Sequence, residues 1–183
     1  QGAPLAPIFH NVMVNKYFSK EDKKKFKINI LNIGGIANVT KISDICFKKN
    51  GENYIEAKDI GPGNCLIDEW IRRNKKGNFD KNGELAQSGT TDQLVLNQAL
   101  DDYENIPKKN ITSFDVNDFE INFLRGLSLE DGASTITDFT SNIISDNLFY
   151  EISKSKINIS KVILCGGGRK NKTLIDSIKM LSD

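Results

Sequence analysis

Three glycine-bearing turns constrain the fold of this chain more than any other feature of its sequence. Each turn follows a short apolar or alternating run that is typical of a β-strand. In α/β folds ligands gather at strand ends, so three such turns in one chain indicate a binding site better than one turn alone. The turns lie at Asn32–Asn38, Asp59–Asn64 and Leu164–Asn171.

The order of the expected elements favours an α/β fold with a mixed sheet. Residues 26–33 and 36–42 alternate around two glycines and predict a β-hairpin, and residues 54–58 predict a third strand. Residues 8–18 fit a helix or a strand. A buried strand is expected over residues 161–165, and helices over residues 64–74 (with Asn64 as N-cap), 92–105, 130–150 and 171–181.

Composition excludes several classes of function. The 183 residues carry 25 basic and 24 acidic side chains, so nothing indicates a nucleic-acid partner. Cys46, Cys65 and Cys165 are far apart with no paired spacing, which argues against a structural zinc site and for reduced thiols in the cytoplasm. No apolar run reaches the roughly 18 residues of a membrane span, and no signal peptide is visible.

The turns do not match the best-known nucleotide motifs. The Gly-x-x-x-x-Gly-Lys pattern of P-loops is missing, and so is a Gly-x-Gly-x-x-Gly turn between a strand and a helix. A glycine hairpin can still offer N–H groups to phosphate oxygens, and a triple-glycine turn can let a flat adenine approach the backbone. His10, the single histidine, is expected to be a partly buried hydrogen-bonding residue, which disfavours a Ser/His or Cys/His hydrolase.

Asp59 is the first candidate for a catalytic group. It combines a carboxylate at a strand end with a glycine turn and the start of a helix, and that helix start can receive an oxyanion. From the residues alone, a general base and a simple turn cap are equally good interpretations. Asp131 and Asp138 lie about two turns apart on one expected helix, where they share a face or are solvated.

Several motifs in a fixed order resemble the anhydro-N-acetylmuramic acid kinases. The resemblance covers nearly the whole chain. It rests on Gln1–Leu5 with Phe9-His10, Asn32–Asn38, Asp59–Asn64, Phe79-Asp80 with Gly83 and Ala86–Gly89, and Cys165–Asn171. It implies the actin/Hsp70/sugar-kinase superfamily, in which two ribonuclease-H-like lobes hold ATP and sugar between them. It also implies that ATP and water convert 1,6-anhydro-N-acetylmuramic acid to N-acetylmuramic acid 6-phosphate during peptidoglycan recycling in the cytoplasm.

The resemblance also implies roles for individual residues, with ATP and Mg²⁺ as cofactors. Asp59 matches the catalytic aspartate of the family. The residues that would line the sugar are Gly61, Pro62, Gly63, Asn64 and, more weakly, Asp138. Those that would bind the nucleotide are Asn32, Gly34, Gly35 and Asn38 at the phosphates, and Gly166, Gly167, Gly168 and Asn171 at the adenosine.

One departure from the superfamily bears on domain organisation. The Gly-Thr-x-x-Asp-Gly phosphate loop of the first lobe is not in this sequence, which opens on Gln1. Residues 1–183 are therefore expected to be mainly the second, C-terminal lobe of a two-lobed kinase, with residues 1–25 joining it to a first lobe that is absent. Such a piece is expected to have little or no turnover by itself. A homodimer is left open.

Two other classes of protein remain as alternatives. One is another sugar kinase, or a carbamoyl- or acyl-transferring member, of the same superfamily. The other is a non-catalytic nucleotide-binding or scaffold module.

Overall fold

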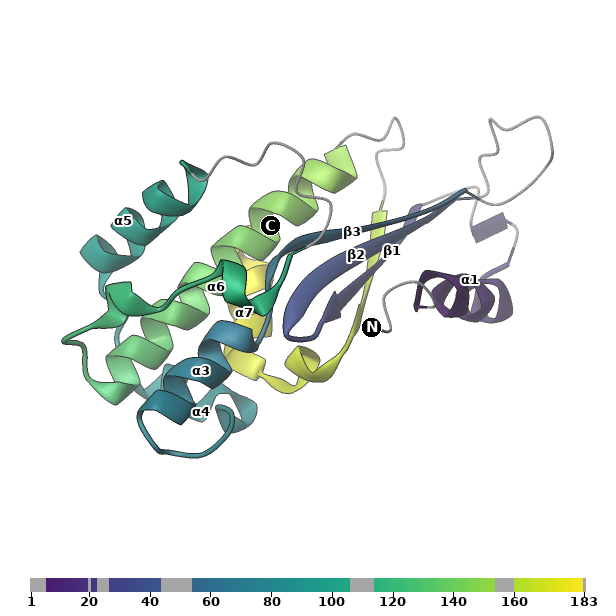
Figure 1. Cartoon of the computed structure of the whole chain (residues 1–183). Helices are drawn as coiled ribbons and strands as arrows, with labels where there is room; N and C mark the ends of the chain where they lie inside the picture. Colours follow the sequence, from purple (N-terminus) through teal and green to yellow (C-terminus); the bar gives the residue numbers. More distant parts are fainter. Residues whose placement is uncertain are drawn as a thin grey trace.

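A mixed four-stranded sheet with strand order β3-β2-β1-β4 forms the centre of the structure (Figure 1). This computed structural model describes residues 6–19, 21–22, 27–43, 54–105, 114–153 and 160–182. The first three strands form an antiparallel meander, and the last pairs in parallel with the first. Their bounds are β1 Lys27–Ile33, β2 Ile36–Ser43, β3 Tyr54–Pro62 and β4 Ser160–Cys165. The prediction of an α/β fold with a mixed sheet flanked by helices is confirmed.

Helices cover both faces of this sheet. The first of them settles the open prediction at residues 8–18 in favour of a helix. Their bounds are α1 Ala6–Tyr17, α3 Cys65–Arg73, α4 Glu84–Ser88, α5 Gln93–Glu104, α6 Leu129–Ser153 and α7 Lys172–Ser182. Within the part of the chain that the structure describes, no helix combines the length and apolarity needed to cross a membrane.

The two faces of the sheet bury different cores. Helix α1 lies against one face, where its Val14 joins Ile28, Ile30 and Ile42 in a small cluster. Helices α3, α6 and α7 lie on the other side and share the main core with residues of β1, β2 and β3 (Figure 1). His10 of α1 is half-buried and its Nδ1 lies 3.0 Å from Thr40 Oγ1, which confirms the role expected of it.

Two local predictions are wrong. Strand β3 runs on to Pro62, so Asp59 lies inside the strand instead of in the turn after it. Strand β4, which was expected to be buried, is an edge strand, and none of its residues is buried because it has a neighbouring strand on one side only. The prediction of Asn64 as the N-cap of α3 is confirmed for its position, although its side chain makes no capping hydrogen bond. Phe26, Cys46 and the motif at residues 1–5 lie outside the described residues.

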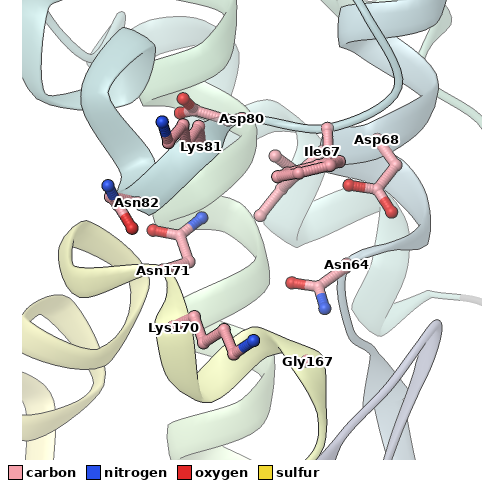
Figure 2. Close-up of a pocket in the computed structure, with 10 residues that line it drawn as sticks. Asn64, Ile67, Asp68, Asp80, Lys81, Asn82, Gly167, Lys170 and Asn171 are labelled. Carbon is pink, nitrogen blue, oxygen red and sulfur yellow. The ribbon is translucent and has the colours of Figure 1, made fainter.

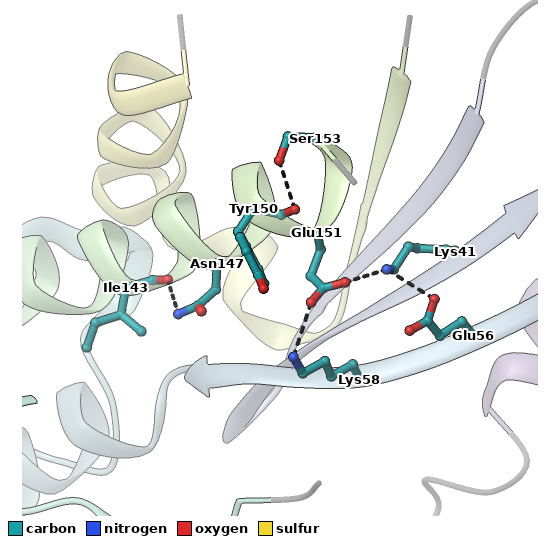
Figure 3. A network of polar contacts seen from close by, with 8 residues as sticks. All are labelled: Lys41, Glu56, Lys58, Ile143, Asn147, Tyr150, Glu151 and Ser153. Atoms are coloured by element: carbon teal, nitrogen blue, oxygen red, sulfur yellow. Dashed lines mark hydrogen bonds and ion pairs between the residues drawn. The ribbon is translucent and has the colours of Figure 1, made fainter. Parts of the chain in front are cut away.

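A buried ion cluster joins helix α6 to the sheet (Figure 3). Glu151 of α6, only 2% exposed, accepts hydrogen bonds from Lys41 of β2 and from Lys58 of β3, the latter at 3.1 Å. Lys41 also pairs with Glu56 at 3.1 Å. The cluster lies near the end of β2 that is farther from the Gly34–Gly35 turn, so its contribution is to hold α6 on the sheet.

Candidate functional site

The sheet topology brings the three glycine turns to one end of the molecule. Strands β1 and β4 are parallel, and β3 runs in the same direction because both β1 and β3 are antiparallel to β2. The first two turns are joined by backbone hydrogen bonds from Gly63 N to Gly35 O and from Asn64 N to Gly34 O, both 2.8 Å. The three strand-end turns on which the sequence analysis based a binding site therefore lie together in the structure.

Close backbone approach explains why glycine stands in these turns. A Cβ atom on Gly63 would lie 2.3 Å from the carbonyl oxygen of Gly34. At the third turn, a Cβ atom on Gly168 would lie 2.3 Å from Ile33 Cγ2 and 3.0 Å from Asn64 Oδ1. Only glycine permits such packing, so the three turns form one compact surface of backbone groups.

Asp59 lies on the α1 side of the sheet in a row of polar side chains. It pairs with Asn38 of β2, which pairs with Asn32 of β1, and residues that face each other across antiparallel strands share a face. A β-bulge between Ala37 and Asn38 shifts the register at this point. Bulges of this kind re-aim side chains and are frequent beside active sites.

The Asp59 carboxylate is half-exposed and fixed on one side. Its Oδ2 accepts a hydrogen bond of 3.1 Å from the backbone N–H of Phe114. This bond holds the carboxylate in place. Such a group can accept a proton from a bound molecule, so the geometry is compatible with a general base.

A pocket of about 460 Å³ opens beside the third glycine turn (Figure 2). It lies between that turn, the first turn of α3 and the segment before α4. Its volume falls within the range of roughly 300–1,000 Å³ that small-molecule sites occupy. The lining residues are Asn64, Ile67, Asp68, Phe79, Asp80, Lys81, Asn82, Gly167, Lys170 and Asn171.

Hydrogen bonds to backbone groups hold the sides of the pocket. Asp80 is 5% exposed, and its two carboxylate oxygens accept bonds of 3.0 Å from Leu85 N and Ala86 N at the start of α4. Asn171 Oδ1 accepts a 3.0 Å bond from Leu174 N and so caps α7. These caps fix two sides of the pocket on rigid helix ends, as a preformed site requires.

Charged groups of both signs face the pocket. The carboxylate of Asp68 is half-buried, and this desolvation raises its pKa to about 6, while the charge of Arg72 opposes the rise. Lys81 and Lys170 are exposed at the pocket. A ligand there meets one carboxylate on α3 and ammonium groups on the opposite segments.

The structure brings most of the predicted site residues together. Asn64, Gly167 and Asn171 line the pocket, and backbone contacts join Asn64 to Gly34 of the first turn and pack Gly168 of the third turn against its side chain. Gly61 and Pro62 are buried near the end of β3, and a Cβ atom on Gly61 would lie 2.5 Å from Ile143 Cγ2. The sugar contacts predicted for Gly61 and Pro62 stay predictions.

Asp138 lies apart from the glycine turns. Its Oδ2 accepts a hydrogen bond of 2.6 Å from Thr91 Oγ1, and its Oδ1 accepts one of 3.1 Å from Ser177 Oγ. It lines a different pocket, of about 680 Å³, among α5, α6 and α7. That pocket shares no lining residue with the first one, and the predicted role of Asp138 toward the sugar stays untested.

Sequence reasoning missed seven of the ten residues that line the first pocket. The residues that line it but were not among the candidates are Ile67, Asp68, Phe79, Asp80, Lys81, Asn82 and Lys170. Phe79 and Asp80 were quoted only as part of a motif that carries the family resemblance. A helical spacing of four residues between Asn64 and Asp68 was the available signal for Asp68.

Comparison with known proteins gives one family. The family profile described as anhydro-N-acetylmuramic acid kinase matches residues 1–182. Proteins of that name from Pelagibacter ubique, Zymomonas mobilis and Rhizorhabdus wittichii are 44%, 33% and 35% identical over 98%, 98% and 97% of this chain. The matches cover 45%, 46% and 44% of those proteins, so the chain spans less than half the length of these relatives.

Proposed function

Because this chain belongs to the anhydro-N-acetylmuramic acid kinase family, we propose that it supplies one side of the ATP- and sugar-binding cleft of such a kinase. The enzyme would open 1,6-anhydro-N-acetylmuramic acid and phosphorylate it to N-acetylmuramic acid 6-phosphate. The observation that supports this most is the convergence of three glycine turns beside Asp59.

Asp59 is the proposed general base. Water attacks the anomeric carbon of the anhydro-sugar and gives its proton to Asp59. The bond from that carbon to the bridging oxygen breaks, and the oxygen keeps the electron pair on the sugar. It then attacks the γ-phosphorus of ATP, the bond to the β-phosphate oxygen breaks, and ADP leaves. Asp59 finally releases its proton to solvent.

The glycine turns are proposed to hold ATP. The N–H groups around Gly34 and Gly35 would receive phosphate oxygens, with Asn32 and Asn38 beside them, and the pocket at Gly167 and Asn171 would take the adenosine. Asn64 lines the same pocket, which favours a nucleotide contact over the sugar contact expected from the sequence.

Magnesium would be held mainly by ATP. Among the described residues no group of three or more His, Cys, Asp or Glu side chains could hold a metal ion. This fits Mg²⁺, which is commonly bound through substrate phosphates, water and one or two carboxylates. Its contribution when bound is to neutralise charge on the phosphates.

The cellular setting is part of the same proposal. Residues 1–183 would form mainly the second lobe of a two-lobed kinase, with residues 1–25 between the lobes. The activity would serve peptidoglycan recycling in the cytoplasm, with ATP and the anhydro-sugar as partners.

Replacement of Asp59 tests the proposal. Asp59→Asn in the full-length gene product should lower kcat for the anhydro-sugar by about 10²- to 10⁴-fold, because the amide cannot take the proton from water. The KM for ATP should change little. The assay measures ATP-dependent formation of the 6-phosphate, with Asp101→Asn on the exposed face of α5 as the matched control. Normal activity of Asp59→Asn would remove this residue from the mechanism.

The acceptor sugar is tested in the same assay. Anhydro-sugars without the lactyl group and ordinary hexoses are compared with 1,6-anhydro-N-acetylmuramic acid. A clearly higher kcat/KM for an anhydro-sugar without the lactyl group, or for an ordinary hexose, would contradict the proposed substrate. The protein would then be a kinase for that other sugar.

A further inference from the structure

The pocket beside the third glycine turn contains an aromatic ring and a carboxylate that the reaction does not use. Phe79 is 61% exposed although it is a large apolar residue, and Asp68 is a half-buried acid on α3. Both line the pocket, from different segments. Neither feature stabilises the protein by itself, since an exposed ring buries little surface and a half-buried carboxylate loses hydration.

Phe79 is held at the pocket by its neighbour. The next residue, Asp80, is buried and its carboxylate binds the backbone N–H groups of Leu85 and Ala86. The backbone at Phe79 is therefore anchored to the start of α4 while the ring stays uncovered. An exposed aromatic ring that is carried on an anchored backbone beside a cavity offers a flat surface on which a nucleobase can stack.

Asp68 faces the same cavity. It follows Asn64 by four residues on α3, so both side chains lie on one face of the helix, and Figure 2 shows the two polar groups turned toward the same space. Among the described residues, no hydrogen bond reaches the Asp68 carboxylate. A ligand with an N–H donor would supply that bond.

We propose that Phe79 and Asp68 recognise the base of the nucleotide, Phe79 by stacking and Asp68 by accepting a hydrogen bond from the 6-amino group of adenine. The inference rests on the proposed function, which places the adenosine in this pocket. Guanine carries a carbonyl oxygen at the same position, and a carboxylate repels such an acceptor. The pair therefore selects ATP over GTP.

The raised pKa of Asp68 agrees with this role. A carboxylate that is desolvated and lacks a hydrogen bond within the described chain is typical of binding sites that are completed by a ligand. Its negative charge at neutral pH also sets the preference for a donor over an acceptor on the base.

The test compares ATP with the triphosphate of purine riboside, which is ATP without its 6-amino group. Binding of both to the full-length gene product is measured by calorimetry, and kcat/KM is measured for both with the anhydro-sugar. The unmodified protein should prefer ATP by about tenfold to a hundredfold, because a hydrogen bond to a charged group is lost with the analogue. Asp68→Ala should bring this ratio close to one.

Phe79 is tested by a matched pair of exposed phenylalanines. Phe79→Ala should weaken both nucleotides alike by about fivefold or more, because stacking does not depend on the amino group. Phe79→Trp should restore binding. Phe149→Ala, at a ring that is 70% exposed on α6 outside this pocket, should change neither affinity.

The outcomes separate this inference from the proposed function. An unchanged ratio in Asp68→Ala, or better use of GTP than ATP by the unmodified protein, overturns base recognition while the kinase reaction stands. Selective binding without turnover of any sugar overturns the kinase reaction while base recognition stands. Failure to bind either nucleotide overturns both.

Discussion

At the scale of single residues, Asp68 shows how a binding group can reduce the stability of the folded chain. The carboxylate is half-buried on α3, and the charge of Arg72 offsets only part of the lost hydration, so its pKa rises from 3.8 to about 6. Between these two pH values the folded state binds more protons than the unfolded state. The free energy of unfolding therefore falls as the pH rises through this range.

Asp68→Asn should stabilise the protein at neutral pH. The expected gain at pH 7.5 is about 1 kcal/mol, less than the whole shift would give, because water screens a half-buried carboxylate. The gain should disappear toward pH 4, where Asp68 is protonated in the folded state. Urea unfolding at both pH values measures it, with Asp101→Asn as a control for the change in net charge. A gain of equal size at both pH values would mean that burial of the charge is not its cause.

At the scale of elements, the contact between α6 and the sheet depends on buried charges as well as apolar side chains. Glu151 is 2% and Lys41 is 7% exposed, so each supplies the other with a partner of opposite charge in the interior. Glu56, the second partner of Lys41, has a side chain that is 40% exposed. Glu151 and Glu56 both pair with Lys41, and they differ mainly in how deeply they are buried.

Glu151→Ala should cost about 3–5 kcal/mol of unfolding free energy, because Lys41 and Lys58 both lose their shared buried acid. Glu56→Ala should cost less than about 1 kcal/mol, as expected for an exposed ion pair. The double variant Lys41→Met with Glu151→Leu should recover most of the loss, since no buried charge then lacks a partner. Chemical denaturation of the three variants checks the order, and similar losses for the two single variants would refute it.

At the scale of the whole molecule, the glycine turns and Asp59 lie at one end of the sheet, on a chain that spans less than half the length of its relatives. Phosphoryl transfer depends on enclosing and neutralising the phosphates from several sides. The glycine turns of this chain would supply backbone N–H donors to the phosphates from one side only.

The 183-residue chain alone should therefore bind ATP weakly and give no measurable turnover. Calorimetry with ATP and the 6-phosphate assay, run beside the full-length gene product, measure the two quantities. Turnover by the chain comparable to that of the full-length product would show that this chain contains the complete active site. Asp68→Ala in the chain alone serves as the control that any binding occurs at the described pocket.

The local pattern of residues was enough to predict the strands, the main helices and the family. Alternation and glycine turns are set by short stretches of chain, so the hairpin and the mixed sheet were predicted correctly. The bulge opposite Asp59, the extension of β3 to Pro62, the exposure of β4 and the missing capping bond of Asn64 were not predicted. Each depends on which neighbour a segment meets.

The tertiary structure alone decided how the functional side chains are grouped. Asp68, Phe79 and Lys170 come from three separate segments, and only the packing of α3, α4 and α7 puts them around one pocket. The same packing sets Asp138 in another pocket, bonded to Ser177 and Thr91. Sequence spacing fixes directions within an element, whereas distances between elements follow from the side chains that fill the space between them.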